Sequence, residues 1–118
     1  MFRFETLEIW QAGMNFTDRI YCFSEKFPKH ELFCLTSQLR RAAISVTANI
    51  AEGSASHGVK DFRNYLNYSI RSVAEIISEL FIARRRDYLQ ESDFNQLYSE
   101  AEVLIRRITC FRNSLHFD

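Results

Sequence analysis

The sequence has very little glycine and proline, the two residues that most often interrupt regular secondary structure. Only three glycines and one proline occur among its 118 residues. This scarcity excludes a glycine- or proline-rich disordered chain and predicts long elements with few breaks. The hydrophobic content of 47%, with eleven phenylalanines, further predicts a folded core in a single domain over residues 1–118.

An excess of charge of either sign is also missing. Fifteen basic and fifteen acidic residues give a formal net charge of zero, so bulk electrostatics singles out neither nucleic acid nor membrane as a partner. Twelve of the basic residues are arginine, whose planar fork grips carboxylates or phosphates with two hydrogen bonds. The arginines therefore suit either salt bridges between helices or subunits, or the phosphates of a ligand.

Cysteine is scarce, and long apolar runs are absent. The cysteines have no metal-ligand spacing, and we expect reduced, buried side chains at Cys22, Cys34 and Cys110, as in a cytoplasmic protein. Glu5 and Glu8 stand where a secretory signal needs an apolar run. The longest uncharged run, 42–51, is too short to span a bilayer, so no membrane partner is expected.

Apolar residues recur at alternating steps of three and four, which is the period of a helix with one buried face. The pattern predicts four helices, at about 5–27, 31–54, 59–86 and 91–113. Pro28 marks the connection between the first two predicted helices, and the small polar run after Gly53 marks the next one. Because the links are short, successive helices run antiparallel, and the predicted fold is all-α, an up-down-up-down antiparallel four-helix bundle.

The stretch 35–53, LTSQLRRAAISVTANIAEG, has an unusual pattern for a surface helix. Besides its core side it carries a second apolar strip, formed by Ile44, Ala48 and Ala51. Between the two lies a narrow polar stripe of Gln38, Arg41, Ser45, Asn49 and Glu52. A surface helix usually has one apolar face, so we expect this polar stripe to line an oligomer interface. The alternative is that the stripe faces water.

Arg41 and Glu52 share this stripe but lie three turns apart, about 16 Å along the helix axis. They cannot pair within their own helix, and an unpaired charge at an interface is costly. Each is therefore expected to find a partner on another helix or in another subunit. Arg40 falls on a different side of the helix, so Arg40 and Arg41 do not form one phosphate clamp.

No catalytic, cofactor or metal motif has convincing spacing. The three histidines fall in a turn, a loop and the C-terminal tail, and the Glu-x-x-His motif of di-iron bundles is absent. Phosphate-binding loops, dinucleotide fingerprints and nucleophile elbows are absent too. The sequence predicts a protein that is not an enzyme, with no cofactor and no small-molecule substrate. Three carboxylates, Glu52, Glu75 and Glu79, are expected to form salt bridges with Arg40, Arg41 or Arg71.

Basic residues gather near the end of the third predicted helix and within the fourth. These candidates for nucleic-acid contact are Arg84, Arg85, Arg86, Arg106 and Arg107. In one copy they form scattered spots, whereas a ring of identical subunits would multiply each spot into a band that binds phosphates. The run Arg84, Arg85 and Arg86 is explained equally well by the favourable interaction of cations with the negative, C-terminal end of the helix dipole.

The stretch 35–53 resembles the signature of the bacterial four helix bundle proteins, L-T-x-Q-L-R-R-A-x-x-S-I-x-x-N-I-A-E-G, with Val46 in place of isoleucine. Leu7, Trp10 and the pair Tyr88-Leu89 also match, so the resemblance covers nearly the whole chain. The family includes proteins encoded by intervening sequences within large-subunit ribosomal RNA genes. One departure is the loop after Gly53, which lacks the family's arginine and so gives less support to phosphate binding there.

Relatives of this family are similar to the accessory protein of diversity-generating retroelements, a ring of five bundles that binds a reverse transcriptase and nucleic acid. The resemblance implies a ring-shaped homo-oligomer, with a homopentamer as the first choice. It further implies a non-enzymatic scaffold that binds RNA or a nucleic-acid-handling protein. The alternative is a protein-protein assembly module with no nucleic-acid contact.

Overall fold

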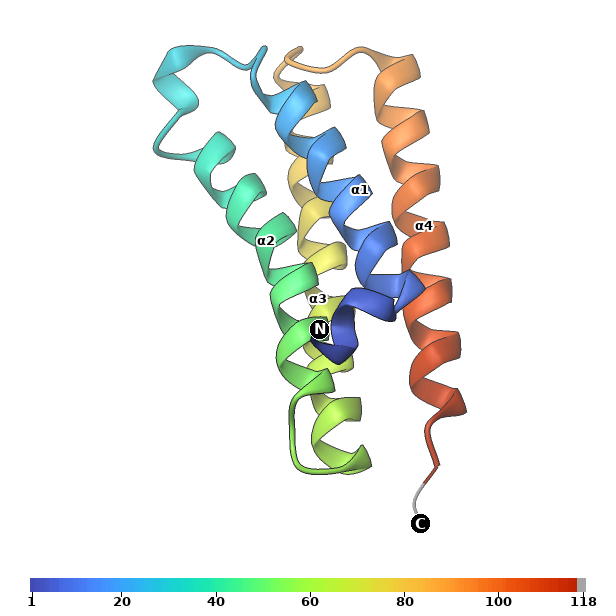
Figure 1. Cartoon of the computed structure of the whole chain (residues 1–118). Coiled ribbons are helices and arrows are strands. Elements are labelled where there is room, and N and C mark those ends of the chain that lie inside the picture. The colour runs from blue at the N-terminus through green and yellow to red at the C-terminus, as the bar shows by residue number, and fades with distance from the viewer. Residues whose placement is uncertain (117–118) are drawn as a thin grey trace.

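In a computed structural model, residues 1–116 are described and form four α-helices (Figure 1). The helices are α1 (Glu8–Ser24), α2 (Leu35–Ser54), α3 (Val59–Arg85) and α4 (Glu91–Ser114). Two short 3-10 helices, η1 (Arg3–Thr6) and η2 (Lys29–Glu31), precede α1 and α2. Successive α-helices run antiparallel, which confirms the predicted all-α four-helix bundle. The last two residues of the predicted domain, 117–118, lie outside the described part.

The first two helices are shorter than the periodicity predicts. Leu7 has an extended backbone with φ −85° and ψ 124°, so residues before it form η1 and α1 begins at Glu8 instead of residue 5. Likewise, Cys34 has φ −129° and ψ −102°, so α2 begins at Leu35 instead of residue 31. A carboxylate oxygen of Glu31 accepts a hydrogen bond of 3.4 Å from the Leu35 N–H, which satisfies one free donor at the start of α2.

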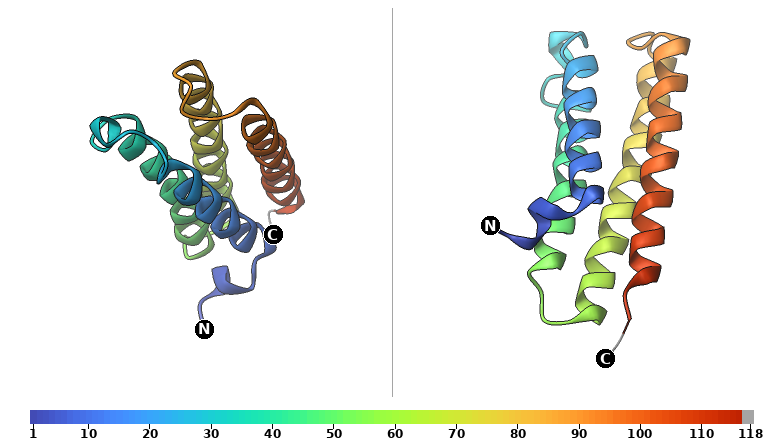
Figure 2. Two further views of the ribbon diagram at one scale, coloured as in Figure 1. Left: turned by 90° about the horizontal axis from the view of Figure 1, so that it is seen from above. Right: turned by 45° about the vertical axis from the view of Figure 1, so that its right-hand side comes forward.

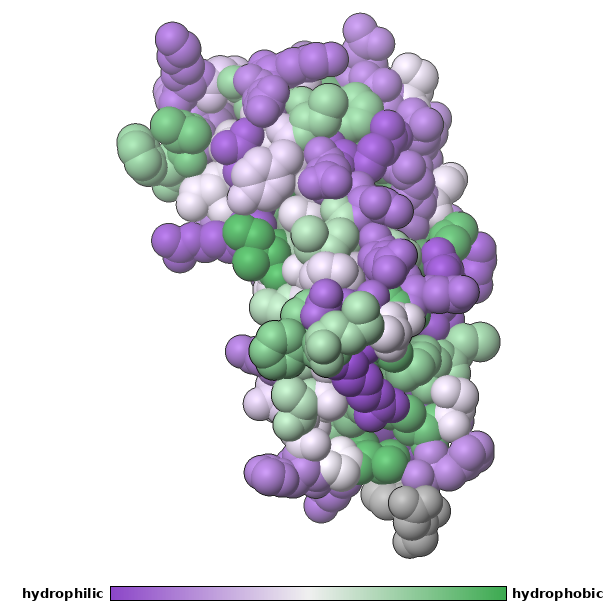
Figure 3. All heavy atoms as spheres, in the orientation of Figure 1, coloured by the Kyte–Doolittle hydropathy of each residue, from purple (hydrophilic) through white to green (hydrophobic). Residues whose placement is uncertain are grey.

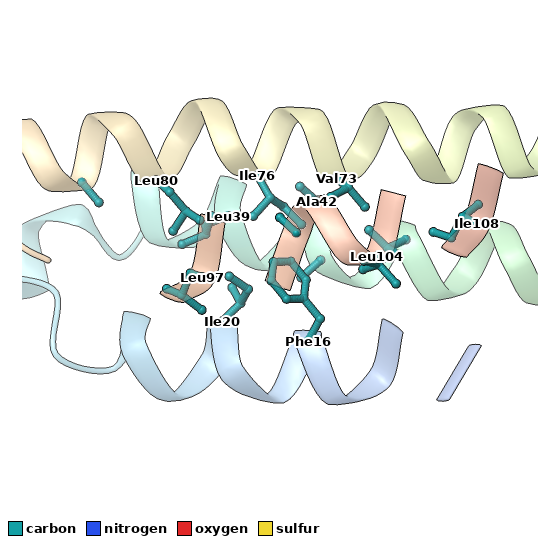
Figure 4. Close-up of a cluster of buried hydrophobic side chains, with 14 of the residues drawn as sticks. Phe16, Ile20, Leu39, Ala42, Val73, Ile76, Leu80, Leu97, Leu104 and Ile108 are labelled. Carbon is teal, nitrogen blue, oxygen red and sulfur yellow. The ribbon is translucent and has the colours of Figure 1, made fainter. Parts of the chain in front are cut away.

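The core runs along the bundle axis between all four helices (Figure 4). Large aliphatic side chains with almost no exposed surface come from each helix, among them Ile20, Leu39, Ile76, Leu97 and Ile108. Burying one such side chain contributes roughly 1.5–3 kcal/mol. The resulting body is elongated, 50 × 24 × 21 Å, with α1 beside α2 and α3 beside α4 (Figure 2).

Gly53 lets α2 and α3 approach closely near one end of the bundle. A Cβ added there would lie 2.7 Å from Tyr65 Cβ and 2.8 Å from Phe62 Cδ1. Further along the same pair, the buried Ser69 hydroxyl donates to the Val46 carbonyl at 2.8 Å. Gly53 therefore acts as a packing residue inside α2, which ends one residue later at Ser54.

The cysteines contradict the expectation from sequence. Cys22, Cys34 and Cys110 are all exposed. Cys22 and Cys110 escape burial by their apolar neighbours because consecutive helical residues point about 100° apart. Cys34 lies in the turn before α2. Within residues 1–116, no helix combines the length and apolar character needed to cross a membrane.

Candidate functional site

The polar stripe of α2 lies along its boundary with α3, and its middle is tied to that helix. Ser72 of α3 donates a hydroxyl hydrogen bond to Ser45 Oγ at 2.9 Å. Asn49 donates from Nδ2 to the Ser45 carbonyl at 2.8 Å and to Ser45 Oγ at 2.9 Å. We call this boundary the α2–α3 seam, and it comprises Gln38, Arg41, Ser45, Asn49 and Glu52 of α2 with Ser72, Glu75 and Glu79 of α3.

The charged ends of the stripe have no such link. Arg41 and Glu52 are exposed, and in the described part of the chain neither takes part in an ion pair or a side-chain hydrogen bond. Between them on the outside of α2, Ile44 leaves 49% of its surface exposed and Ala48 is exposed as well. The bundle therefore leaves the middle of this side of α2 uncovered, with two free opposite charges flanking apolar side chains, while η1 lies beside α2 at the Glu52 end.

Arg40 lies on a different side of α2 from Arg41, as the sequence indicates, and contacts α1. Its Nε donates to Ser24 Oγ of α1 at 2.9 Å, and its guanidinium lies 4.8 Å from the centre of the Tyr21 ring. Arg71 lies over the Tyr68 ring at 5.8 Å. The expected salt bridges of Glu52, Glu75 and Glu79 with Arg40, Arg41 and Arg71 are therefore absent from residues 1–116.

Glu79 is buried, although the apolar periodicity of α3 does not predict it. Only 6% of the residue is exposed, and among the described residues its Oε1 has no hydrogen-bond partner. Burial, followed by a hydrogen bond to Glu75 and the charge of Glu75, raises the pKa of Glu79 to about 7. Glu79 follows Ser72 by seven positions, two helical turns, and that spacing is the sequence signal that places it toward α2.

The candidate nucleic-acid residues lie in separate places. Arg84 is committed to the bundle, because its guanidinium lies 4.1 Å from the Phe94 ring centre and its Nη1 pairs with Glu91 at 3.3 Å. Arg85 and Arg86 are exposed at the end of α3. Arg106 and Arg107 are exposed on α4, more than three turns from its start. In one copy, therefore, the five arginines do not form a single basic patch. The exposed ones form two separate pairs, Arg85 with Arg86 and Arg106 with Arg107.

A second surface feature is a groove between α1 and α4, which lie side by side in Figure 2. Its walls are largely apolar and include Ala12, Phe16, Val103 and Leu104. An ion pair marks each end, Arg19 with Glu100 at 3.2 Å and Arg107 with Glu8 at 3.8 Å. Both pairs join residues distant in sequence, so no local pattern could reveal this groove.

Exposed apolar side chains also occur on the connection between η2 and α2. Phe33 leaves 93% of its surface exposed, and Leu32 beside it is exposed as well. In the space-filling view, apolar residues project at the upper left over this connection (Figure 3). The exposed apolar surface on the α2 side of the molecule thus extends beyond the helix itself.

A small polar network fastens this connection to the bundle. The Tyr88 hydroxyl donates to Glu31 Oε2 at 2.9 Å and lies 3.3 Å from His30 Nε2. The Tyr88 hydrogen bond is the main reason that the pKa of Glu31 lies below its ordinary value. Within residues 1–116, no group of three or more histidine, cysteine or acidic side chains is arranged to hold a metal ion.

These observations define a class of protein: a short antiparallel four-helix bundle whose second helix is only partly covered. The chain belongs to the 23S rRNA-intervening sequence protein family, which matches residues 5–110. The family resemblance of the stretch 35–53 is thereby confirmed. No curated protein matches the chain at a significant level.

A solved structure supports the fold independently. It is the crystal structure of a protein with unknown function from the S23 ribosomal protein family of Bacteroides thetaiotaomicron VPI-5482. The two share a TM-score of 0.82 and 19% sequence identity, over 90% of this chain and 96% of that chain. At this identity, the likeness establishes the bundle and nothing about what it binds.

Proposed function

We propose that this protein is a non-enzymatic scaffold that assembles with copies of itself through the uncovered side of α2. The observation that carries the proposal is the pair of unpartnered charges on Arg41 and Glu52 with Ile44 and Ala48 between them. Charges of both signs around a small apolar centre are typical of specific protein interfaces with a polar rim. A ring of five copies is our first choice, because the resemblance of the stretch 35–53 implies that number.

Light scattering coupled to size-exclusion chromatography tests this proposal. We expect the wild-type protein to elute as one assembly, and Arg41→Ala or Glu52→Ala to weaken it. The matched control is Arg85→Ala, which removes another exposed arginine, at the end of α3. A monomer at every protein concentration would contradict self-assembly. Equal behaviour of all three variants would show that the α2 charges are not involved.

RNA binding is the second candidate function, and the exposed pair Arg85 and Arg86 favours it. In a ring, copies of this pair would form a circle of cationic groups, which bind phosphates more tightly as salt falls. Structured RNA should shift in a gel at low ionic strength with the wild-type protein but not with the variant Arg85→Glu, Arg86→Glu. Without a shift at low ionic strength, the protein is an assembly module with no nucleic-acid contact.

We also propose that the scaffold works in the cytoplasm. Three exposed cysteine side chains on one small protein suit a reducing compartment, where thiols stay free. Fractionation of cells that express the protein with its native N-terminus tests this location. Recovery from a membrane or secreted fraction would contradict it.

A further inference from the structure

The geometry points to the α1–α4 groove of a neighbouring copy as the surface that receives the uncovered side of α2. This inference rests on the proposed self-assembly and adds which two surfaces meet. We define the outer face of α2 as Arg41, Ile44, Ala48 and Glu52. The occupant of the groove is therefore a second copy of this chain, presented through one exposed helix.

Contacts between α1 and α2 show which residues lie at equal heights along the bundle. Arg40 bonds Ser24, and the Thr17 hydroxyl donates to the Ala43 carbonyl at 3.2 Å. Lower down, a Cβ at Gly13 would lie 3.0 Å from Thr47 Cγ2. Because these helices are antiparallel, the Thr17–Ala43 and Gly13–Thr47 contacts place Arg41 level with Arg19, while the long Arg40 side chain reaches further along α1 to Ser24.

The same register places Glu52 at the height of Glu8, three turns below Arg41. Two ion pairs across the groove show which residues of α4 lie at these two heights. Arg19 pairs with Glu100, and Glu8 pairs with Arg107. Arg41 is thus level with Glu100, and Glu52 is level with Arg107.

Charges of opposite sign therefore meet at both heights when α2 enters the groove. The Arg41 guanidinium faces the Glu100 carboxylate, and the Glu52 carboxylate faces the Arg107 guanidinium. Arg107 can accept this partner, because its bond to Glu8 is long at 3.8 Å and the Glu8 side chain is 91% exposed. Glu100 can bridge two arginines, since an ionised carboxylate has about four acceptor positions.

Between these two heights, both the outer face of α2 and the α1–α4 groove carry apolar side chains. Ile44 and Ala48 lie between Arg41 and Glu52 on α2, and the groove between its ion pairs is walled by Ala12, Phe16 and Val103. Val103 is 43% exposed in the single copy. Docking removes this surface and that of Ile44 from water, which favours association.

The two surfaces are different, so the contact is heterologous and leads from copy to copy in one direction. Such a contact closes into a ring when the rotation between neighbours closes, and otherwise it builds a filament. Here the matched charges lie at equal heights on the two surfaces. Neighbours therefore need no step along the bundle axis, which is the condition for a closed ring.

Paired charge reversals test this contact by light scattering and native mass spectrometry. Arg41→Glu and Glu100→Arg should each raise the protein concentration needed for assembly by about tenfold or more, because like charges then face each other. The double variant Arg41→Glu, Glu100→Arg should restore assembly. Glu52→Arg with Arg107→Glu forms the second, independent pair. Glu102→Arg is the control, an exposed acidic residue on α4 that does not line the groove.

The outcomes separate this contact from the proposed function. Rescue by both double variants supports it. Rescue by Arg41→Glu with Glu52→Arg instead would show that α2 packs on α2 of the partner, which overturns it. Intact assembly in every single reversal also overturns it while leaving self-assembly in place, whereas a monomeric wild type removes both. Circular dichroism checks folding, and Glu100→Gln replaces Glu100→Arg if that variant unfolds, with weakened assembly expected.

Discussion

Ser45 of α2 and Ser72 of α3 are joined by a hydroxyl hydrogen bond of 2.9 Å at the middle of the α2–α3 seam. Asn49 donates to the same Ser45 hydroxyl, so one oxygen accepts two hydrogen bonds. All three side chains are half-buried. This link fixes the register of α2 against α3, and so it also fixes the heights at which Arg41 and Glu52 emerge on the surface.

Replacing Ser45 should weaken the bundle. Ser45→Ala removes the shared acceptor and leaves Ser72 without this partner, which is expected to cost about 1 kcal/mol of unfolding free energy. Urea unfolding followed by circular dichroism measures the loss. Ser37→Ala is the control, because Ser37 is also half-buried on α2 and should change stability by less than about 0.5 kcal/mol. Equal losses in both variants would contradict a specific role of the link.

Stability should fall as pH rises through neutrality, because of Glu79. Its folded-state pKa is raised from 4.5 to about 7. Between these values the folded protein keeps a proton that the unfolded chain has already released. This contribution to stability is therefore complete below the unfolded pKa and is lost as pH rises through about 7.

The variant Glu79→Gln should remove this dependence, since glutamine stays neutral and can donate to Glu75. Thermal unfolding at pH 5 and pH 8 measures the effect. We expect the decline in stability between the two to shrink by about 2–3 kcal/mol in Glu79→Gln. The exposed Glu102→Gln should keep the wild-type profile. An unchanged profile in Glu79→Gln would show that Glu79 titrates normally.

Replacing Gly13 of α1 and Gly53 of α2 by alanine should change stability in different ways. Gly53→Ala places a methyl group 2.7 Å from Tyr65 Cβ, an atom that cannot move without its backbone, so a loss of about 1–3 kcal/mol is expected. Gly13→Ala meets the tip of Thr47 at 3.0 Å and gains up to about 1 kcal/mol of helix propensity. Melting temperatures should therefore drop clearly for Gly53→Ala only. The reverse order would refute close helix approach at Gly53.

Arg84 should matter for stability and Arg85 should not. Arg84→Ala removes a guanidinium that lies 4.1 Å from the Phe94 ring centre and pairs with Glu91, which is expected to cost about 1 kcal/mol. Arg85→Ala alters an exposed side chain and should stay within about 0.5 kcal/mol of wild type. Chemical denaturation of both variants makes the comparison. A larger loss for Arg85→Ala would reverse these assignments.

The sequence predicts the helices and the core because their cause is local. Steps of three and four place Leu39 and Leu97 on inward faces whatever the rest of the chain does. The residue at which a helix begins is harder to predict from the sequence. Leu7 leaves the helical conformation although the apolar spacing continues through it, so the predicted start at residue 5 is wrong.

Features made by distant residues escape prediction. A sequence separation of eleven suffices to show that Arg41 and Glu52 cannot pair in one helix. The groove proposed to receive them depends on Arg19 and Glu100, which are 81 positions apart and meet only in the folded bundle. The burial of Glu79 has the same origin: its spacing from Ser72 indicates only the side of α3 on which it lies, and its burial arises in the folded bundle.

The exposed thiols give this protein its own set of labelling positions. Cys22 lies on α1, Cys34 just before α2 and Cys110 on α4. Any two can be changed to serine, which leaves one site for a maleimide dye on each copy. Donor-labelled and acceptor-labelled pools can then be mixed, and any rise in energy transfer reports whether copies join the proposed assembly and how fast they exchange.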